Sequence, residues 1–265
     1  LLGIAYASSI GGLGTIIGSP PNGIAAAKLQ LSFAQWMKFG VPCVIILLPL
    51  MVIVLRMICR PIKGLTIAVE EQEFVFNWHR IATLLIFCAT ALCWIFGSWI
   101  SKWLGLSGAI DTIIALAAVF LLLYFRVVRW RDIDNGTDWG VLILFGGGLS
   151  LSEMLNRTGA STYLAKMLSS GIDAWPVVLI MIAIIAFVIF SGELASNTAS
   201  AALLVPIFYS VSTELGFSAA SLVIPIALAS SCSFMLPVGT PPNAIVFGTG
   251  LVRMPQMLRA ALWLH

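Results

Sequence analysis

Charged side chains are scarce in this sequence, and their scarcity excludes most classes of water-soluble protein. Only 9% of the 265 residues are Asp, Glu, Lys or Arg, against about a quarter in a typical soluble domain. Hydrophobic residues make up 60% of the chain. A soluble core of this length cannot enclose so much apolar surface, so lipid must cover the remainder. The net charge of +3 is too small to indicate a nucleic-acid partner.

Histidine and cysteine are too few and too scattered for a transition-metal or redox site. The histidines are His79 and His265, and no two cysteines form a CxxC pair. We interpret all five cysteines as small packing residues: Cys43, Cys59, Cys88, Cys93 and Cys232. An HExxH motif, a GxSG motif beside a membrane histidine and an aspartate pair within the spans are also missing. An intramembrane enzyme therefore has no support, and no organic cofactor is expected.

Charge-free runs predict membrane-spanning helices, each of which needs about 20 apolar residues. Ordinary spans are expected at 39–58, 81–100 and 106–125. A further helix from Trp139 is expected to break at the glycines 146–148 and to continue as an amphipathic piece. The fold class predicted is an all-α, multi-pass protein of the cell (plasma or inner) membrane. Because the sequence opens in an apolar run without Met and stops soon after a new one begins, we expect a fragment of a longer protein.

Three apolar regions contain interruptions. Region 3–30 is interrupted at 18–22 by Gly-Ser-Pro-Pro-Asn, and region 220–250 at 239–243 by Gly-Thr-Pro-Pro-Asn. Region 176–212 consists of two apolar arms joined by Ser-Gly-Glu-Leu-Ala-Ser-Asn-Thr. Two successive prolines cannot continue a helix, although a lone pair can simply produce a kink. Backbone freed in this way is tolerated at membrane depth only where protein buries it or it lines a wet cavity.

The basic residues between the spans suggest an orientation, because cytoplasmic loops are enriched in Lys and Arg. The predicted cytoplasmic set is Arg56, Arg60, Lys63, Arg80, Arg126, Arg129, Arg131, Arg253 and Arg259, and the opposite set is Lys28, Lys38, Lys102, Arg157 and Lys166. This assignment requires 176–212 to return to its own side as a hairpin. A full crossing by each arm would place 193–197 in a loop, and the charge distribution alone permits both arrangements.

The two Pro-Pro-Asn motifs belong to an internal repeat. Ala7-Ser8-Ser9 precedes the first motif, Ala229-Ser230-Ser231 precedes the second, and the motifs lie 221 positions apart, with one residue of slippage between the segments. In the predicted orientation the first interrupted helix runs outward and the second runs inward, so the repeats are inverted. Interrupted helices at corresponding places in two inverted halves indicate the midplane binding site of a transporter, although a channel can also carry half-helices.

The interruptions offer neutral oxygen ligands and helix N-termini. Backbone carbonyls, hydroxyls and the side chains of Asn22, Asn197 and Asn243 suit Na⁺, while an anion gains from the unpaired amides and dipole of each helix that starts there. No Lys or Arg lies in the interruptions. Glu193 has two interpretations: it bonds across the hairpin to Asn197 as a scaffold, or it tunes a cation site.

At these residues the sequence resembles the divalent anion:sodium symporter family, which carries dicarboxylates, citrate or sulfate. The similarity covers essentially the whole chain and rests on Ser-Ile-Gly-Gly at 9–12 leading to 18–22, on Ser-Asn-Thr at 196–198, and on Leu-Pro-Val-Gly-Thr-Pro-Pro-Asn-Ala-Ile-Val-Phe-Gly at 236–248. It implies a homodimer of elevator-type subunits. Each subunit has two inverted repeats, with a re-entrant hairpin and an unwound helix in each repeat.

The resemblance divides the chain into segments of a transport domain and a scaffold domain. The expected segments are a broken transport-domain helix at 1–30, a span at 31–60, a cytoplasmic connector at 61–80, scaffold spans at 81–138, a spanning and an amphipathic helix at 139–175, the re-entrant hairpin at 176–212, the second broken transport-domain helix at 213–250, and the start of a truncated last helix at 251–265.

The resemblance also implies site residues. The second sodium site would use Asn197 with backbone at Gly192, Ala195 and Gly239, and the first would use Gly18. The substrate pocket would be lined by Ser19, Pro20, Ser196, Asn197, Thr198, Thr240 and Pro241. Ser19 stands where the family often has Thr. The family's first Ser-Asn-Thr hairpin does not occur in this sequence, so half of the first sodium site and half of the anion pocket are not visible in it.

The function implied is import of a C4-dicarboxylate, citrate or sulfate coupled to Na⁺, with sodium as the only metal. The partners expected are a small anion, the lipid bilayer and a second copy of the chain. A sodium-independent exchanger, or an anion channel or exporter of the same superfamily, remains as the alternative.

Overall fold

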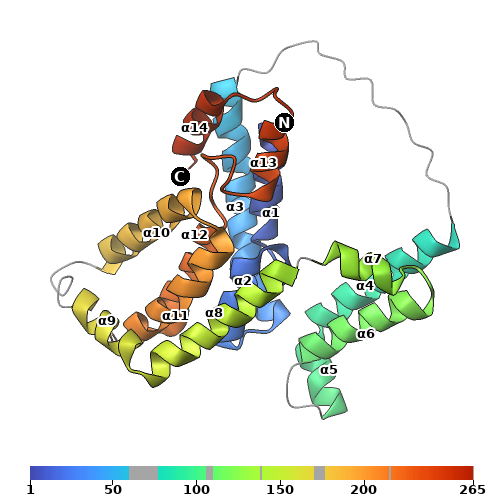
Figure 1. The fold of residues 1–265 in the computed structure, drawn as a ribbon. Coiled ribbons are helices and arrows are strands. Elements are labelled where there is room, and N and C mark those ends of the chain that lie inside the picture. Colours follow the sequence, from blue (N-terminus) through green and yellow to red (C-terminus); the bar gives the residue numbers. More distant parts are fainter. Residues whose placement is uncertain (60–76, 106–109, 138, 170–176, 215, 265) are drawn as a thin grey trace. The chain divides into compact units, whose positions relative to one another are not determined.

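A computed structural model describes residues 1–59, 77–105, 110–137, 139–169, 177–214 and 216–264, and every regular element within these ranges is a helix. Most of the connector expected at 61–80 lies outside the described residues. The chain divides into two compact units (Figure 1). The first unit comprises Leu1–Leu31, Trp36–Pro61 and Gly140–His265, and the second comprises Ser32–Gln35 and Ile62–Trp139.

The second unit contains α4 (Trp78–Ile95), α5 (Gly97–Leu104), α6 (Ile110–Tyr124) and α7 (Trp130–Gly136). The span expected at 81–100 is therefore wrong as a single helix, because the structure divides it after α4. Asp111 at the start of α6 lies against Gly97, the first residue of α5. A Cβ on Gly97 would lie 3.1 Å from its Oδ1, so glycine lets the two helices meet closely there.

Asp111 also fixes the start of α3 (Phe33–Cys59) within the second unit. Its Oδ2 accepts a hydrogen bond of 2.8 Å from the Phe33 N–H, and its backbone carbonyl accepts one of 3.0 Å from Trp94 Nε1. The Phe33 and Trp94 rings stack with centroids 4.9 Å apart. A carboxylate at a helix N-terminus stabilises the amides that the helix leaves unpaired.

The first unit contains the interrupted helices and the hairpin. The first interrupted helix is α1 (Leu2–Gly12), a 3-10 turn (Ile16–Gly18) and α2 (Pro20–Leu29); the second is α12 (Ala219–Ser230) and α13 (Pro241–Gly248). The hairpin is α10 (Val177–Leu194) and α11 (Asn197–Glu214). The unit also contains α3 from Trp36 onward, α8 (Trp139–Arg157), α9 (Ala160–Ser169) and α14 (Met254–Leu262).

Each interrupted helix contributes one half to each of two apolar cores. One core joins α2, α11 and α12 around Ala25, Val205 and Ile226. The other joins α1, α13 and α14 around Tyr6, Val246 and Met257. The halves thus pack crosswise, α1 with α13 and α2 with α12. The irregular backbone of each interruption therefore connects the two cores, and Phe234 and Met235 of the second interruption belong to the second core.

Two expectations about helix breaks are corrected. Helix α8 continues through Gly146–148 and ends at Arg157, before Gly159 with a positive φ of 74°. Glycine alone costs a helix only about 1 kcal/mol, and Gly148 serves close packing, since a Cβ there would lie 2.5 Å from Ala202 Cβ. In the hairpin, α10 continues to Leu194, so that only Ala195 and Ser196 separate the arms.

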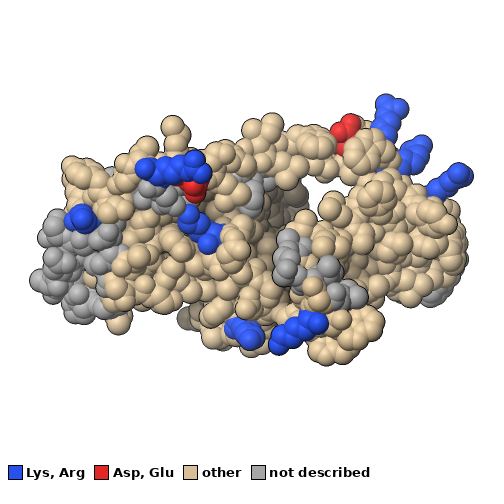
Figure 2. Space-filling model, turned by 90° about the horizontal axis from the view of Figure 1, so that it is seen from below, with Lys and Arg blue, Asp and Glu red and all other residues tan. Residues whose placement is uncertain are grey.

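The surface of the described helices suits lipid. Helices Phe33–Ile58 and Trp78–Ile95 are long and apolar enough to cross a membrane, and Ile110–Tyr124, Val178–Leu194 and Ala219–Ser230 are shorter apolar helices. Large apolar side chains on α3 are exposed, with Ile45 and Ile46 at 65% and 66%. On the face seen in Figure 2, wide uncharged areas separate the few Lys and Arg side chains.

Candidate functional site

The proline pairs begin the second half of each interrupted helix. Pro20 and Pro21 occupy the first positions of α2, and Pro241 and Pro242 occupy those of α13. Proline is favoured there because its missing N–H would have no helical partner and its φ is already helical. Thr240 caps α13 by accepting the Asn243 N–H through its hydroxyl at 3.4 Å.

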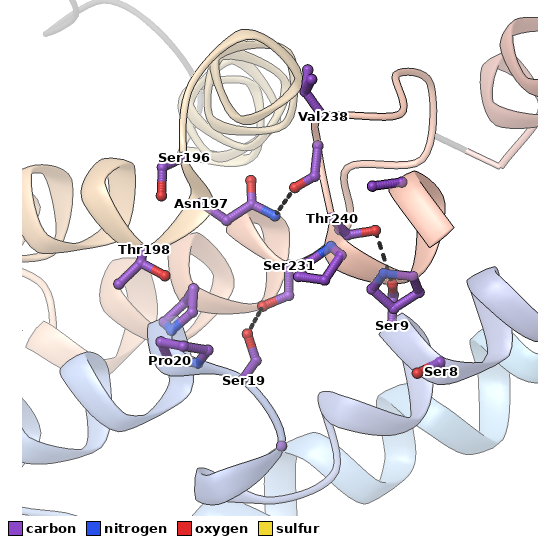
Figure 3. Close-up of a pocket in the computed structure, with 16 residues that line it drawn as sticks. Ser8, Ser9, Ser19, Pro20, Ser196, Asn197, Thr198, Ser231, Val238 and Thr240 are labelled. Atoms are coloured by element: carbon purple, nitrogen blue, oxygen red, sulfur yellow. Dashed lines mark hydrogen bonds between the residues drawn. The ribbon is translucent and has the colours of Figure 1, made fainter. Parts of the chain in front are cut away.

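Serine and threonine hydroxyls join the two interrupted helices in a crosswise pattern (Figure 3). Ser9 at the end of α1 donates to Thr240 Oγ1 at 3.5 Å, and Ser19 and Ser231 share a hydrogen bond of 2.8 Å between their Oγ atoms. In the repeat, Ser9 corresponds to Ser231 and Ser19 to Thr240. Each bond therefore joins positions that do not correspond in the repeat: Ser9 bonds to the counterpart of Ser19, and Ser19 bonds to the counterpart of Ser9.

The tip of the hairpin is bonded to the second interruption. Asn197 Nδ2 donates to the Gly239 carbonyl at 2.9 Å, and Asn197 Oδ1 accepts from Ser233 Oγ at 3.0 Å. One turn earlier, Glu193 is only 3% exposed. Its two carboxylate oxygens accept the N–H groups of Met235 and Leu236, each at 2.8 Å. The carboxylate thus holds the second interruption against the hairpin, as a scaffold, and Asn197 is not its partner in these bonds.

Two glycines permit this close approach. A Cβ on Gly192 would lie 2.7 Å from Ser233 Oγ and 2.8 Å from Asn197 Oδ1. One on Gly239 would lie 2.9 Å from Ser233 Cβ and 3.1 Å from Glu193 Oε2. These distances are shorter than ordinary contacts, so a side chain at either position would push the hairpin and the second interruption apart.

The interruptions and the hairpin tip surround one cavity of about 520 Å³. Among the described residues, its lining contains hydroxyls, one amide, backbone and apolar side chains but no charged side chain: Ser8, Ser9, Gly18, Ser19, Pro20, Pro21, Ser196, Asn197, Thr198, Ser231, Val238, Gly239, Thr240, Pro241, Pro242 and Ala244. Helices α2, α11 and α13 all begin at residues of this lining. Three partly positive N-terminal ends therefore meet at the cavity.

The structure brings together all the residues that the sequence assigns to the substrate pocket. Ser19, Pro20, Ser196, Asn197, Thr198, Thr240 and Pro241 line the cavity. Of the positions assigned to sodium, Gly18, Asn197 and Gly239 line it as well. Gly192 is buried beside Asn197, whereas Ala195 is exposed in the hairpin turn, and neither lines the cavity.

Sequence reasoning missed Ser8, Ser9 and Ser231 as lining residues. Their signal was present, because the repeated Ala-Ser-Ser triplets supply all three. The partners of Glu193 and the role of Ser233 had no such signal, since these contacts join residues 36 to 43 positions apart.

Interrupted helices and a hairpin tip surround a cavity whose described lining combines hydroxyls with apolar groups, in a chain with exposed apolar helices, and this combination defines a membrane protein that handles a small solute. The chain belongs to the sodium:sulfate symporter family, whose transmembrane-region model matches residues 1–265. This finding confirms the resemblance to divalent anion:sodium symporters. The family is one of transporters rather than enzymes.

Curated relatives align with nearly all of the chain. An uncharacterized transporter of Haemophilus influenzae is 47% identical over 272 residues, which cover 100% of this chain and 59% of that protein. The sodium-dependent dicarboxylate transporter SdcS of Staphylococcus saprophyticus is 35% identical over 290 residues, which cover 100% of this chain and 55% of that protein. An uncharacterized transporter of Methanocaldococcus jannaschii is 36% identical over 264 residues, which cover 99% of this chain and 60% of that protein. The chain thus spans between 55% and 60% of these relatives.

Proposed function

We propose that the complete protein imports a small divalent or trivalent anion, a C4-dicarboxylate, citrate or sulfate, by secondary active transport coupled to Na⁺. The observation that carries this proposal is the cavity where three helix N-termini meet the hydroxyls and the Asn197 amide, with no charged side chain among the described lining residues. The name of the SdcS relatives supports a dicarboxylate, and the name of the family supports sulfate.

The cavity suits an anion that arrives with cations. Helix N-termini and hydroxyl donors stabilise oxyanions without a salt bridge. With no Lys or Arg among the described lining residues, however, a second negative charge would have no counter-charge from them. Bound Na⁺ supplies that charge, so the affinity for the anion depends on the cation and the two are carried together.

Neutral oxygens that could bind the cation lie at or beside the cavity. In the second site, Asn197 and Gly239 already touch, and a carbonyl that accepts one hydrogen bond keeps a second lone pair for a cation. In the first site, Gly18 lies against the backbone of Gly12, so closely that neither position has room for a Cβ. Gly192 and Ala195 would contribute backbone from the hairpin to the second site.

The remaining features of the proposal concern the whole protein. The crosswise packing of α1 with α13 and of α2 with α12 supports an inverted repeat. The division into two units supports a transport domain moving against scaffold spans at 81–138 as an elevator. We extend the proposal to a multi-pass homodimer in the cell membrane, on the basis of the family resemblance.

Uptake by the full-length protein tests the coupling. Radiolabelled succinate, citrate and sulfate are offered to proteoliposomes with an inward Na⁺ gradient or with choline in its place. Accumulation that requires Na⁺ is the expected result for at least one of the three anions. Equal uptake in choline contradicts the coupling; uptake only against internal anion indicates an exchanger, and flux that simply follows the anion gradient indicates a channel or exporter.

A further inference from the structure

The two interruptions are held by the same internal hydrogen bonds, in the same register. In the first, Asn22 Nδ2 donates to the carbonyls of Gly12 and Thr15 at 3.0 and 2.8 Å. In the second, Asn243 Nδ2 donates to those of Ser233 and Leu236 at 3.0 and 3.2 Å. Each asparagine thus reaches the carbonyls ten and seven residues before it.

In each interruption, one carbonyl held by the asparagine also accepts the N–H of the glycine assigned to a cation site. The Thr15 carbonyl that Asn22 holds also accepts the Gly18 N–H at 3.3 Å. The Leu236 carbonyl that Asn243 holds likewise accepts the Gly239 N–H at 3.1 Å. Each asparagine therefore positions, through one shared carbonyl, the glycine whose backbone faces the cavity.

A third matched bond comes from an aromatic side chain. Trp36 Nε1 donates to the Leu13 carbonyl at 3.0 Å, and the Tyr6 hydroxyl donates to the Phe234 carbonyl at 3.0 Å. The two carbonyls stand nine positions before Asn22 and Asn243, respectively. The two donors differ in type and come from different helices. What the two interruptions share is a backbone carbonyl at the same register that accepts a hydrogen bond from a side chain. Three carbonyls of each interruption are thereby fixed in direction.

Both asparagines are fully buried, and the Oδ1 atom of each has no hydrogen-bond partner among the described residues. Turning the amide to satisfy Oδ1 would remove the donor from both carbonyls. In both interruptions, the orientation of the asparagine amide therefore keeps the Nδ2 donor on the backbone carbonyls and leaves the Oδ1 acceptor unsatisfied.

We propose that Asn22 and Asn243 are positioning residues for two cation sites: Asn22 holds the carbonyls around Gly18, Asn243 holds those around Gly239, and each sets the Na⁺ affinity of its site. This inference rests on the proposed function, since it assumes that Na⁺ binds at these glycines. It adds a role to asparagines that do not line the cavity. The preformed geometry spares the cation the cost of ordering the unwound backbone.

Stabilisation of the purified full-length protein by Na⁺ tests the inference without any transport. The melting temperature is measured from low to high NaCl, with choline chloride keeping the ionic strength constant, for the wild type, Asn22→Ala, Asn243→Ala and Asn243→Leu. Asn135→Ala, on the exposed side of α7, is the matched control. Ligand that binds only the folded state raises the melting temperature, so the midpoint of the rise reports Na⁺ affinity.

The Na⁺ midpoint is expected to rise about tenfold or more in all three variants, as for other residues that orient metal ligands, with stabilisation recovered at high Na⁺. The Asn243→Leu variant keeps a side chain of similar size and shape but has neither a donor nor a charge, so a wild-type midpoint in that variant overturns the donor role. A lower melting temperature in Na⁺ and choline alike, with an unchanged midpoint, shows a merely structural role and also overturns it.

A milder variant covers the case in which Asn243→Ala does not fold. Tyr6→Phe removes one hydroxyl from the Phe234 carbonyl and is expected to raise the midpoint less, but in the same direction. An unchanged midpoint in Tyr6→Phe contradicts the inference. If the wild type itself shows no stabilisation specific to Na⁺, the proposed function fails. If the wild type is stabilised by Na⁺ and the variants keep the same midpoint, only the inference about the asparagines fails.

Discussion

Gly192 leaves no room for a methyl group, which makes Gly192→Ala a sharp test of the hairpin's contact with the second interruption. The added Cβ would lie 2.7 Å from Ser233 Oγ and 2.8 Å from Asn197 Oδ1, whereas ordinary contact begins near 3.4 Å. The two oxygens would have to move by about 0.7 Å and about 0.6 Å, respectively, in a buried region that is already closely packed. The alanine therefore acts directly on the side chain assigned to the second sodium site.

The expected cost follows from the bonds that would be disturbed. The two displaced oxygens bond to each other at 3.0 Å, and the same asparagine holds the Gly239 carbonyl at 2.9 Å. A hydrogen bond contributes about 1 kcal/mol net and overpacking costs about 1–3 kcal/mol. If about 2 kcal/mol of this loss falls on the cation-bound state, Na⁺ affinity drops roughly 30-fold.

The assay is the Na⁺ concentration that gives half-maximal anion uptake by the full-length protein in proteoliposomes. Gly147→Ala is the matched control, because a Cβ at this exposed position of α8 meets nothing within 4 Å. Alanine favours a helix over glycine by about 1 kcal/mol, so the control is expected to be at least as stable as the wild type. A wild-type Na⁺ dependence in Gly192→Ala would refute the reasoning.

Three further substitutions follow from single contacts. Glu193→Gln would turn an NH₂ group toward one of two backbone N–H donors and is expected to cost about 2 kcal/mol, seen as a lower melting temperature; equal melting would contradict the scaffold role. Ser231→Ala removes the bond to Ser19, worth about 1 kcal/mol, and should raise the KM for the anion several-fold. An unchanged KM would place this hydroxyl pair outside the anion site. Asp111→Ala removes the acceptor at the start of α3 and should lower stability by about 1 kcal/mol without shifting the Na⁺ midpoint; a shifted midpoint would link this corner to the cation sites.

The parts of the fold that could be predicted from sequence are those governed by local rules. Proline pairs, which lack amide donors, located the starts of α2 and α13, and the Ser-Asn-Thr tip located the start of α11. Because these three starts converge on one cavity, the residues assigned to the substrate pocket also lie together there. Orientation, dimerisation and the movement of the units stay predictions.

The parts that sequence reasoning missed depend on distant contacts or on small energies. At the corner between α4 and α5, Gly97 meets Asp111 of another helix, a contact that no local pattern predicts. The unbroken course of α8 reflects the modest cost of glycine in a helix, which packing against Ala202 readily outweighs. The hydrogen bond between the Ser19 and Ser231 hydroxyls joins residues 212 positions apart, and no local pattern predicts it.

Protection of a cysteine in the cavity tests the central claim, that the anion binds there together with Na⁺. Ser8 is an exposed residue of the lining, so Ser8→Cys in the full-length protein should react with a membrane-impermeant thiol reagent. Reaction rates are compared in choline, in Na⁺, and in Na⁺ with succinate, citrate or sulfate. Ser98→Cys, exposed on α5, and the unsubstituted protein serve as controls.

With ligand at ten times its dissociation constant, only about a tenth of the sites stay free, so labelling should slow about tenfold. The account predicts this protection at Ser8→Cys by at least one of the anions, only when Na⁺ is present, and none at Ser98→Cys. Labelling of Ser8→Cys at the same rate with and without anion and Na⁺, in a protein that still transports, would show that the anion binds elsewhere and would contradict the account.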